Sequence, residues 1–383
     1  MERVRHVWAL APLVPGVAPH LAASCGLWWT IWTALACVTG IESWRATVAW
    51  GVLAGGVYWL LVLAVGVGPW IASRARVRHG GVIPALSPQP EHAIPPPERV
   101  AAALQTGDPP ADALVAHFPA LVAALMRSEE PVVTAAALAE AEYVDAEAAE
   151  ALHALAAPGL GLPAWATPEM LHAGQEVYIV NAGFQGLGLL VSLLESFLFP
   201  EDAAVLAATG ALTGPLDRAA KRALDTGSFI QDLMYAKIDG KRPSRAADAA
   251  LRIRLVHGRA RRMVARSAAW QERGDVPINQ ATSAATLVLF CQVAVESSAT
   301  MGAWMPQTDK DALWTFWRYV GHLMGIDADL VPPSYAGGLA GRCSGMYVGR
   351  LAPDMSSRAL VARTLDAMVG IDELPFDPVV VDS

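Results

Sequence analysis

The stretch "RLVHGRARR" (254–262) places a single histidine among four arginines. It lies inside a segment, 244–270, that has no proline and is rich in Ala, Leu and Arg, which favours a helix. On such a helix an apolar stripe runs past His257. Its members are Ala246, Ala249, Ile253, Val256, Ala260 and Val264. Arg254 at i−3 and Arg261 at i+4 are then the helical neighbours of the imidazole.

Two interpretations of this helix are open. A neutral imidazole on an apolar stripe is a standard ligand of haem iron, and two guanidiniums beside it would pair with carboxylates such as propionates. Alternatively, His257 is a hydrogen-bonded core residue on an otherwise solvated basic helix. Arg252, Arg259, Arg262 and Arg266 fit a solvated face or a contact with anionic lipid headgroups.

The composition limits the class of protein. The chain has 383 residues, of which 54% are hydrophobic and 17% charged, with a mean hydropathy of +0.35. This is more apolar than an ordinary soluble domain. The net charge of −8 argues against a nucleic-acid partner. The four cysteines (25, 37, 291 and 343) show no CxxC or Cys/His spacing, so they predict neither a disulfide framework nor a zinc site.

The apolar excess lies at the N-terminus. No Asp, Glu, Lys or Arg occurs in 7–41 or in 46–73, and each run is long enough for a membrane-spanning helix. We therefore expect transmembrane helices at about 21–41 and 46–71, within an N-terminal anchor of residues 1–79. A cleaved signal peptide or two buried core helices fit less well. Arginines 3, 5, 74, 76 and 78 flank the pair, and only Arg45 lies between the spans, which places the rest of the chain in the cytoplasm.

The segment after the anchor is rich in proline and glycine. "GGVIPALSPQPEHAIPPPERV" (80–100) predicts an extended linker over 80–110. Helical patterns then follow, and alternating strand patterns are almost absent. The expected helices are 111–127, 132–156, 201–209, 215–236, 244–270, 280–300, 308–325 and 356–369. We expect an all-α domain at residues 111–375.

A third charge-free run covers 177–194. Its length allows a further span, but Asn181, Gln185 and three glycines dilute it and Glu195 follows. We therefore expect a buried core helix over 177–200. Dinucleotide-binding, phosphate-loop, zinc-protease, serine-hydrolase and kinase signatures are all missing from the sequence.

Three motifs in order carry a resemblance. "KRALDTGSFIQDLM" (221–234), "RLVHGRARR" followed by "GDVPINQATSAATLVLF" (274–290), and "WTFWRYVGHLMGID" (314–327) resemble the latex clearing protein (rubber oxygenase) family. That family also includes the endoplasmic-reticulum oxygenase of mycophenolic acid biosynthesis. The similarity covers about 165–370. It implies an all-α haem b protein that cleaves carbon–carbon double bonds of polyisoprenoids with dioxygen.

The resemblance also implies roles for individual residues. His257 corresponds to the proximal iron ligand, and Arg222 and Thr226 to residues on the distal side. A helix places Arg222, Thr226, Phe229 and Leu233 on one face, so a cation and a hydroxyl would stabilise charge developing on dioxygen beside apolar surface. The alternative for Arg222 is a surface ion pair with Asp217 or Asp225.

Two departures from the family pattern affect the chemistry. Rubber-cleaving members carry lysine where this chain has Asp225, which is either an acid/base group or a residue that reshapes the pocket. The proposed base of the family has no clear counterpart here, and Glu195 and Glu201 are the candidates. Because those members are secreted whereas this chain is expected in the membrane, an isoprenoid or lipid-like substrate dissolved in the membrane fits better than rubber.

Several interpretations stay open at this point. His322 is expected to hydrogen-bond a backbone carbonyl, the alternative being a second axial ligand. Asn279 and Gln280 are expected at a helix N-cap and first turn. The sequence predicts a membrane-anchored haem b oxygenase that uses dioxygen and contacts membrane lipid. It predicts no oligomeric state. The alternatives are a haem oxygenase or peroxygenase that hydroxylates a small natural product, and a non-catalytic haem protein for electron transfer or gas sensing.

Overall fold

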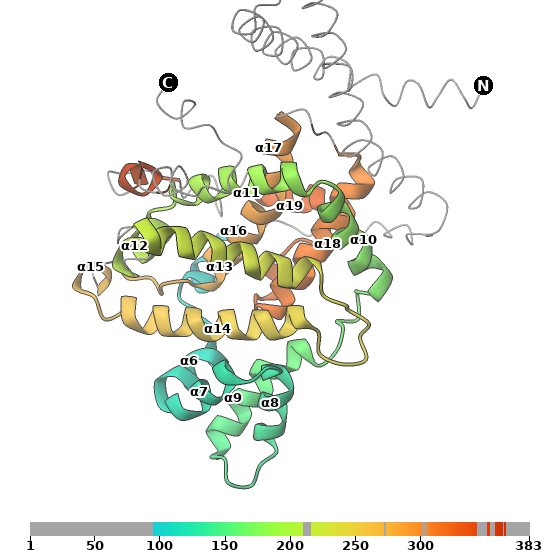
Figure 1. Ribbon diagram of the computed structural model, residues 1–383. Coiled ribbons are helices and arrows are strands. Elements are labelled where there is room, and N and C mark those ends of the chain that lie inside the picture. Colours follow the sequence, from blue (N-terminus) through green and yellow to red (C-terminus); the bar gives the residue numbers. More distant parts are fainter. Residues whose placement is uncertain are drawn as a thin grey trace, which may run out of the picture.

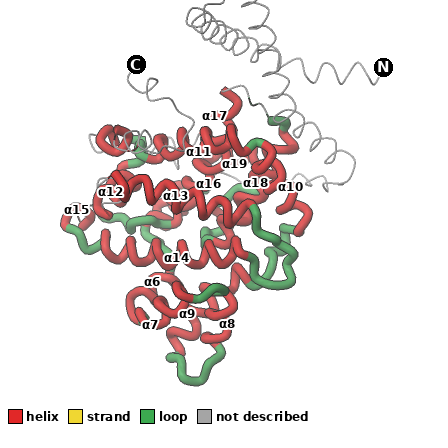
Figure 2. Tube along the Cα trace, viewed as in Figure 1, coloured by secondary structure: helices red, strands yellow, loops and turns green. Residues whose placement is uncertain are grey.

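The computed structural model describes residues 95–209, 216–271, 273–300, 303, 305–342, 351–352, 357–362 and 364. All regular structure within these ranges is helical (Figures 1 and 2), which confirms the all-α class. The predicted anchor of residues 1–79, with both of its spans, lies outside the described residues, as does the predicted domain end at 365–375.

The first helices form a small lobe at the lower end of the molecule in Figure 1. It consists of α6 (Pro109–His117), α7 (Pro119–Arg127), α8 (Pro131–Ala139) and α9 (Ala146–Ala156), which pack on one another. Before them, α5 (Pro97–Leu104) packs on α16 of the main body. The predicted linker 80–110 therefore needs a correction, because its last part is a packed helix and the helical domain begins before residue 111.

The remaining helices form the main body of the domain. In chain order they are α10 (Pro168–Val180), α11 (Ala182–Ser196), α12 (Pro200–Thr209), α13 (Leu216–Met234), α14 (Arg245–Val264), α15 (Ala268–Gln271), α16 (Gln280–Val288), a π-helical turn (Leu289–Val293), α17 (Ala294–Thr300), α18 (Gln307–Leu323) and α19 (Tyr335–Arg342). The core centres on α18, whose Trp314, Phe316 and Trp317 are at most 1% exposed. Gly174 of α10 allows α10 and α18 to approach closely, since a Cβ there would collide with the Ala312 carbonyl and Phe316.

Helix starts follow the capping and proline signals of the sequence. Asp108, Asp145, Thr167, Ser244 and Asn279 each precede a helix and accept a hydrogen bond from a backbone N–H of its first turn. Proline occupies the first turn of α5, α6, α7, α8 and α10. The N-cap predicted at Asn279 is confirmed by the bond from the Thr282 N–H to its Oδ1, at 2.9 Å.

Several predicted helices are shorter than expected. The segment 111–127 is broken at Phe118, before Pro119, and 132–156 is broken by the loop that precedes Asp145. Helix 244–270 ends at Val264 and is followed by the short α15. The expected helix 177–200 is wrong in a more consequential way: the chain turns by 89° at Asn181, so the run is shared by α10 and α11.

One described helical segment, Gln280–Ala299, is long and apolar enough to cross a membrane, and 72% of its apolar window is buried inside the protein. Two bent pairs pass the same test only when each is counted as one span. They are Pro97–His117 with Pro119–Arg127, and Pro168–Val180 with Ala182–Ser196.

Candidate active site

The candidate site lies on α14, the long helix that crosses the front of the molecule in Figure 1. Ser244 caps this helix by accepting a hydrogen bond from the Ala247 N–H at 3.2 Å. His257 is half-buried, whereas Arg254 and Arg261 are only 4% and 5% exposed. All three side chains line one small cavity of about 20 Å³, together with Gly107, Asp108, Ile278, Gln280, Ser283, Met324 and Ile326.

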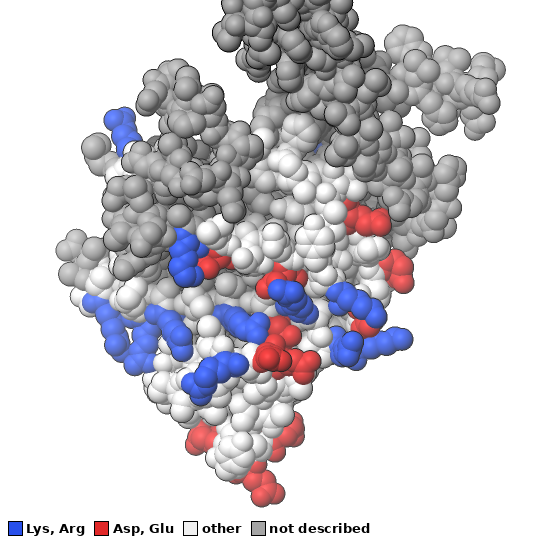
Figure 3. All heavy atoms as spheres, in the orientation of Figure 1, with Lys and Arg blue, Asp and Glu red and all other residues white. Residues whose placement is uncertain are grey.

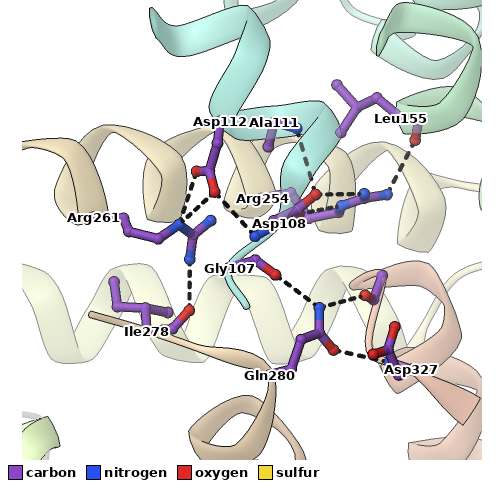
Figure 4. Close-up of polar contacts among 11 residues, drawn as sticks. Gly107, Asp108, Ala111, Asp112, Leu155, Arg254, Arg261, Ile278, Gln280 and Asp327 are labelled. Atoms are coloured by element: carbon purple, nitrogen blue, oxygen red, sulfur yellow. Dashed lines mark hydrogen bonds and ion pairs between the residues drawn. The ribbon is translucent and has the colours of Figure 1, made fainter. Parts of the chain in front are cut away.

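Both buried arginines pair with aspartates of α6 and its N-cap (Figure 4). The Nε and Nη2 atoms of Arg254 donate to the two carboxylate oxygens of Asp108, at 2.7 and 2.8 Å. Its Nη1 donates to the Leu155 carbonyl at 3.2 Å. All three nitrogens of Arg254 therefore donate to the chain itself, in the bidentate geometry that makes such pairs strong.

Arg261 is held differently. Its Nε donates to both oxygens of Asp112, at 2.8 and 2.9 Å, and its Nη1 to the Ile278 carbonyl at 2.5 Å. Ile278 adopts a positive φ of 50°, a conformation that a β-branched residue rarely takes. The Nη2 atom of Arg261 is buried and has no hydrogen-bond partner among the described residues. One strong donor in this cavity is thus unsatisfied, which is uncommon for a buried polar group.

Glutamine 280 ties the loops around the cavity together. Its Nε2 donates to the carbonyls of Gly107 and Gly325, at 2.9 and 3.0 Å, and its Oε1 accepts from the Asp327 N–H at 2.9 Å. Gly325 has a φ of 71°, and a Cβ there would lie 2.8 Å from the Arg254 guanidinium carbon. Only glycine satisfies both conditions, so this loop is shaped around the buried arginine.

Burial shifts two pKa values around the site. Burial raises the pKa of the Asp112 carboxyl, and the charge of Arg261 opposes that shift. Burial lowers the pKa of His322, the positive charge of Arg254 lowers it further, and a hydrogen bond to the Pro158 backbone opposes both effects. His322 thus has the backbone partner expected of it, and it also stacks on Tyr319 with 6.4 Å between ring centroids.

The predicted apolar stripe of α14 is only partly covered. Ala246, Ala249 and Val264 are buried, but Val256 is 41% exposed and Ile253 and Ala260 are half-buried, like His257. The fully buried face is a different one: Gly258 lies against Ala111 and Val115 of α6, between the two buried arginines. The histidine side of α14 therefore presents apolar surface that other described helices leave partly open.

The residues expected on the distal side lie on α13, which packs on α14 and runs in front of the core in Figure 1. Thr226 and Asp225 are exposed, and the side chain of Arg222 lies outside the described residues. Asp225 forms an ion pair with Lys221 at 2.8 Å, one helical turn away. Asp225 thus has Lys221 as an ion-pair partner, and the expected alternative of a pair with Arg222 falls outside the described side chains.

The two candidate bases occupy different surroundings. Glu201 lies in the first turn of α12, which packs directly on α14, whereas Glu195 lies near the end of α11, which packs on α17. Both side chains are partly buried. Of the two, only Glu201 belongs to a helix that packs on the helix of His257.

The arrangement at His257 can be tested against the requirements of a haem. A macrocycle is far larger than a 20 Å³ cavity, so it would have to cover the partly open histidine side of α14. An imidazole beside exposed apolar surface fits such a group. The unsatisfied Nη2 of Arg261 fits a propionate. Arg254 does not fit as a propionate partner in this geometry, because Asp108 and Leu155 accept its hydrogen bonds.

The sequence shows the spacing of the two aspartates but not which residues they pair with. "GDPPAD" (107–112) predicts the start of a helix, and it also places two carboxylates four residues apart. The two arginines that they contact are seven residues apart.

No set of three His, Cys, Asp or Glu side chains arranged to hold a metal ion is found within the described residues.

A larger hollow lies next to this site. It has a volume of about 660 Å³ and is bordered by α6, the C-terminal half of α14 and the loop 270–277. Arg261 lines both hollows, and Arg262, Arg266 and Trp270 line only the larger one. The hollow is within the size range of small-molecule pockets.

Comparison with known proteins now decides the family. A family model described as ER-bound oxygenase mpaB/B′/Rubber oxygenase, catalytic domain, matches residues 178–379, more than half of the chain. The chain belongs to this family. Members of the ER-bound oxygenase and rubber oxygenase family are oxygenases, so the protein is an oxidoreductase of that kind, as the sequence motifs predicted.

The fold agrees with this family. A solved structure described as latex clearing protein LCP in the closed state superimposes with a TM-score of 0.52, at 21% sequence identity, over 70% of this chain and 71% of that one. At this identity the likeness concerns the fold. None of the curated proteins matches the chain. The matched family region begins at residue 178, so Asp108 and Asp112 come from helices that precede it.

Proposed function

We propose that the protein is a membrane-anchored, haem b-dependent oxygenase that uses dioxygen to cleave a C=C bond in an isoprenoid or lipid-like substrate. The observation that carries the proposal is the half-buried His257 beside the unsatisfied, buried Nη2 of Arg261, in a chain of the rubber oxygenase family. Family membership supports an oxygenase, and the residues around His257 support the cofactor.

Each site residue is assigned a role within this proposal. His257 would hold the iron through its imidazole, and Arg261 would bind a propionate through Nη2. Arg254 is a positioning residue, because its pair with Asp108 fixes the turn of α14 that carries His257. The haem, when bound, supplies the chemistry that activates dioxygen.

The residues of α13 would act on the opposite side of the cofactor. We assign Thr226 and Arg222 to hydrogen bonding and to stabilising negative charge that develops on oxygen during the reaction. Glu201 is the preferred proton acceptor over Glu195, since α12 packs on α14. Asp225 is the second candidate, and its exposed pair with Lys221 would have to open first.

The stoichiometry of cleavage gives a direct test. Breaking a C=C bond with one O2 yields two carbonyl groups, and both oxygen atoms enter the products without an external reductant. Purified full-length protein should therefore convert an isoprenoid substrate under ¹⁸O2 to products that carry one labelled oxygen each. A single labelled oxygen in a hydroxylated, uncleaved product, with dependence on added reductant, would favour the hydroxylating alternative instead.

The proposed membrane anchor is supported by the two charge-free runs of the N-terminal 79 residues. An isoprenoid or lipid-like substrate dissolved in the bilayer would reach a domain held at its surface. The flanking arginines favour a cytoplasmic domain.

A further inference from the structure

Helix α11 buries polar side chains and exposes two large apolar ones, although Leu189, Leu193 and Leu194 pack against buried apolar clusters. Gln185 and Ser192 on its inner face are 0% and 4% exposed, and Asn181 at its N-cap is 7% exposed. On the outer side, Phe184 and Val191 are 43% and 42% exposed. A surface helix in water usually keeps polar side chains such as these on its outer face.

The side chains of Asn181, Gln185 and Ser192 each donate a hydrogen bond within the protein, although the buried Oε1 atom of Gln185 accepts none among the described residues. The Nε2 atom of Gln185 donates to Ser298 Oγ of α17 at 3.2 Å, and Ser298 Oγ lies 3.0 Å from the Phe184 carbonyl. Gly188 lies against the backbone of Ala294, where a Cβ would collide with the carbonyl. Turning α11 to bury its outer face would break these contacts and drive larger side chains into α17.

The outer face is open to its surroundings. No atom lies within 4 Å of where a Cβ would stand at Gly183 or Gly186. No charged residue occurs from 177 to 194. The Lys and Arg side chains gather instead in a band across the middle of the molecule in Figure 3, and the described surface visible above that band is mostly white. The last turn of α10 adds Ile179, which is 37% exposed.

The length of the segment between the expected anchor and the described domain indicates what covers this face. If residues 1–79 hold the protein in a bilayer, as the proposed function states, the tether to the domain is only residues 80–94. Fifteen residues span at most about 50 Å when fully extended. The domain thus stays next to the bilayer, and an uncharged apolar helix face is the surface that a hydrocarbon boundary would accept.

From these observations we propose that the outer face of α11, defined by Phe184, Leu187, Leu190 and Val191, lies in the interface of the lipid bilayer together with Ile179 at the end of α10, and sets the orientation of the domain. This inference rests on the anchored state in the proposed function. Since the face carries no Lys or Arg, its contact with lipid is expected to be independent of salt and of anionic headgroups.

Site-specific fluorescence in the full-length protein tests this contact. A small fluorescent amino acid replaces Phe184 in one protein and, as a matched control, Tyr143 in another. Tyr143 is 81% exposed in the loop between α8 and α9, at the opposite end of the molecule from α11 (Figure 1). Both proteins are reconstituted in phosphatidylcholine nanodiscs, with or without lipids brominated on their acyl chains.

The probe at position 184 should be quenched by the brominated lipids and should be several-fold less accessible to aqueous iodide than the probe at 143, at low and high salt alike. Equal iodide access at both positions would overturn the proposal. Shielding of position 184 from both quenchers would also overturn it, because protein would then cover the face. A probe at Val191 repeats the test if the first substitution impairs folding.

The haem absorbance of the same samples separates the two proposals. A protein that holds haem while its α11 probe stays in water contradicts only the lipid contact. A protein that lacks haem while its probe is quenched by lipid contradicts only the proposed cofactor. Failure to stay with the membrane after alkaline extraction would remove the anchor on which the inference rests.

Discussion

Two carboxylate–guanidinium pairs hold the site helix in place, and of these Asp108–Arg254 is buried whereas Asp112 of the Asp112–Arg261 pair is partly exposed. Asp108 and Arg254 are 10% and 4% exposed at their side chains and share two hydrogen bonds, whereas the surface pair Lys221–Asp225 is 72% and 64% exposed. Removing one partner of a buried pair strands a charge away from water, which costs far more than removing an exposed partner.

Asp108→Asn should therefore lower the free energy of unfolding by about 3–5 kcal/mol. Urea unfolding of the detergent-solubilised protein, followed by tryptophan fluorescence, measures the loss. Lys221→Met serves as the exposed control and should change stability by less than about 1 kcal/mol. The double variant Asp108→Asn/Arg254→Met should recover part of the loss. Equal, small changes in the free energy of unfolding in both single variants would show that the buried pair does not stabilise the fold.

His322 gives the protein a dependence of stability on pH. In the folded state burial lowers its pKa, and the charge of Arg254 lowers it further. The bond to the Pro158 backbone opposes both effects. Between this lowered pKa and the ordinary histidine pKa of about 6.5, the unfolded chain binds more protons than the folded chain. The stability contributed by neutral His322 is complete above that pH and is lost as the pH falls through the lowered pKa.

Melting temperatures measured between about pH 5 and pH 8 should fall on the acid side, and His322→Gln should flatten that part of the curve. An unchanged acid slope in the variant would mean that another group carries it. The bond from His322 to a carbonyl was expected from sequence, because a histidine on an aromatic-rich helix needs a partner. The arginine charge near it could not be foreseen, since it depends on how α14 packs beside α18.

Whether the proposed site works as an oxygenase site depends on helix α13. It packs on α14, its residues 224–228 are exposed, and its exposed Leu224 offers apolar surface. Arg222→Ala and Thr226→Val remove the proposed donors and leave the iron ligand in place.

Both variants should keep the haem absorbance of the parent protein and lose turnover by about 10²–10³-fold each, the range found when one such donor is removed from a dry site. Substrate consumption and the Soret band measure the two effects separately. Asp225→Lys introduces the residue of rubber-cleaving members and should shift the resting spectrum towards six-coordinate iron. Parent-like turnover in Arg222→Ala together with an unchanged spectrum in Asp225→Lys would make α13 a scaffold helix.

Element boundaries were predictable where the signal is local. Ser244 and Asn279 mark helix starts because their side chains cap the first turn, and α12, α13 and α18 begin within two residues of the expected positions. The break at Asn181 was not predictable from a charge-free run. It depends on the inner face of α11, where Gln185 and Gly188 contact α17, and such tertiary contacts leave no periodic signal.

The segment that precedes the family region supplies the partners of the two buried arginines of the site. The family match begins at residue 178, yet the aspartates that bind Arg254 and Arg261 belong to the lobe and N-cap at 108–112. The motifs around His257 predicted the family and the all-α fold. The aspartate partners were missed because they are about 150 residues away in the chain, and pairing at that distance cannot be read from one sequence.

The membrane orientation makes a prediction for the whole chain. Arginines flank the two predicted spans on the outside of the pair, so a reporter fused after residue 80 should report the cytoplasmic side. Reversing the bias, by moving arginines from 74, 76 and 78 into the turn around Arg45, should invert the signal. A reporter on the external side in the unaltered chain would contradict the charge argument and would make an extracellular substrate accessible.

The most direct test of the whole account is the absorption spectrum of full-length His257→Ala beside that of His322→Ala. His257 is proposed to supply the bond to iron, whereas His322 hydrogen-bonds the Pro158 backbone. The account predicts that His257→Ala loses the Soret band and its haem content, and that His322→Ala retains both. Full haem content with an unchanged spectrum in His257→Ala would contradict it.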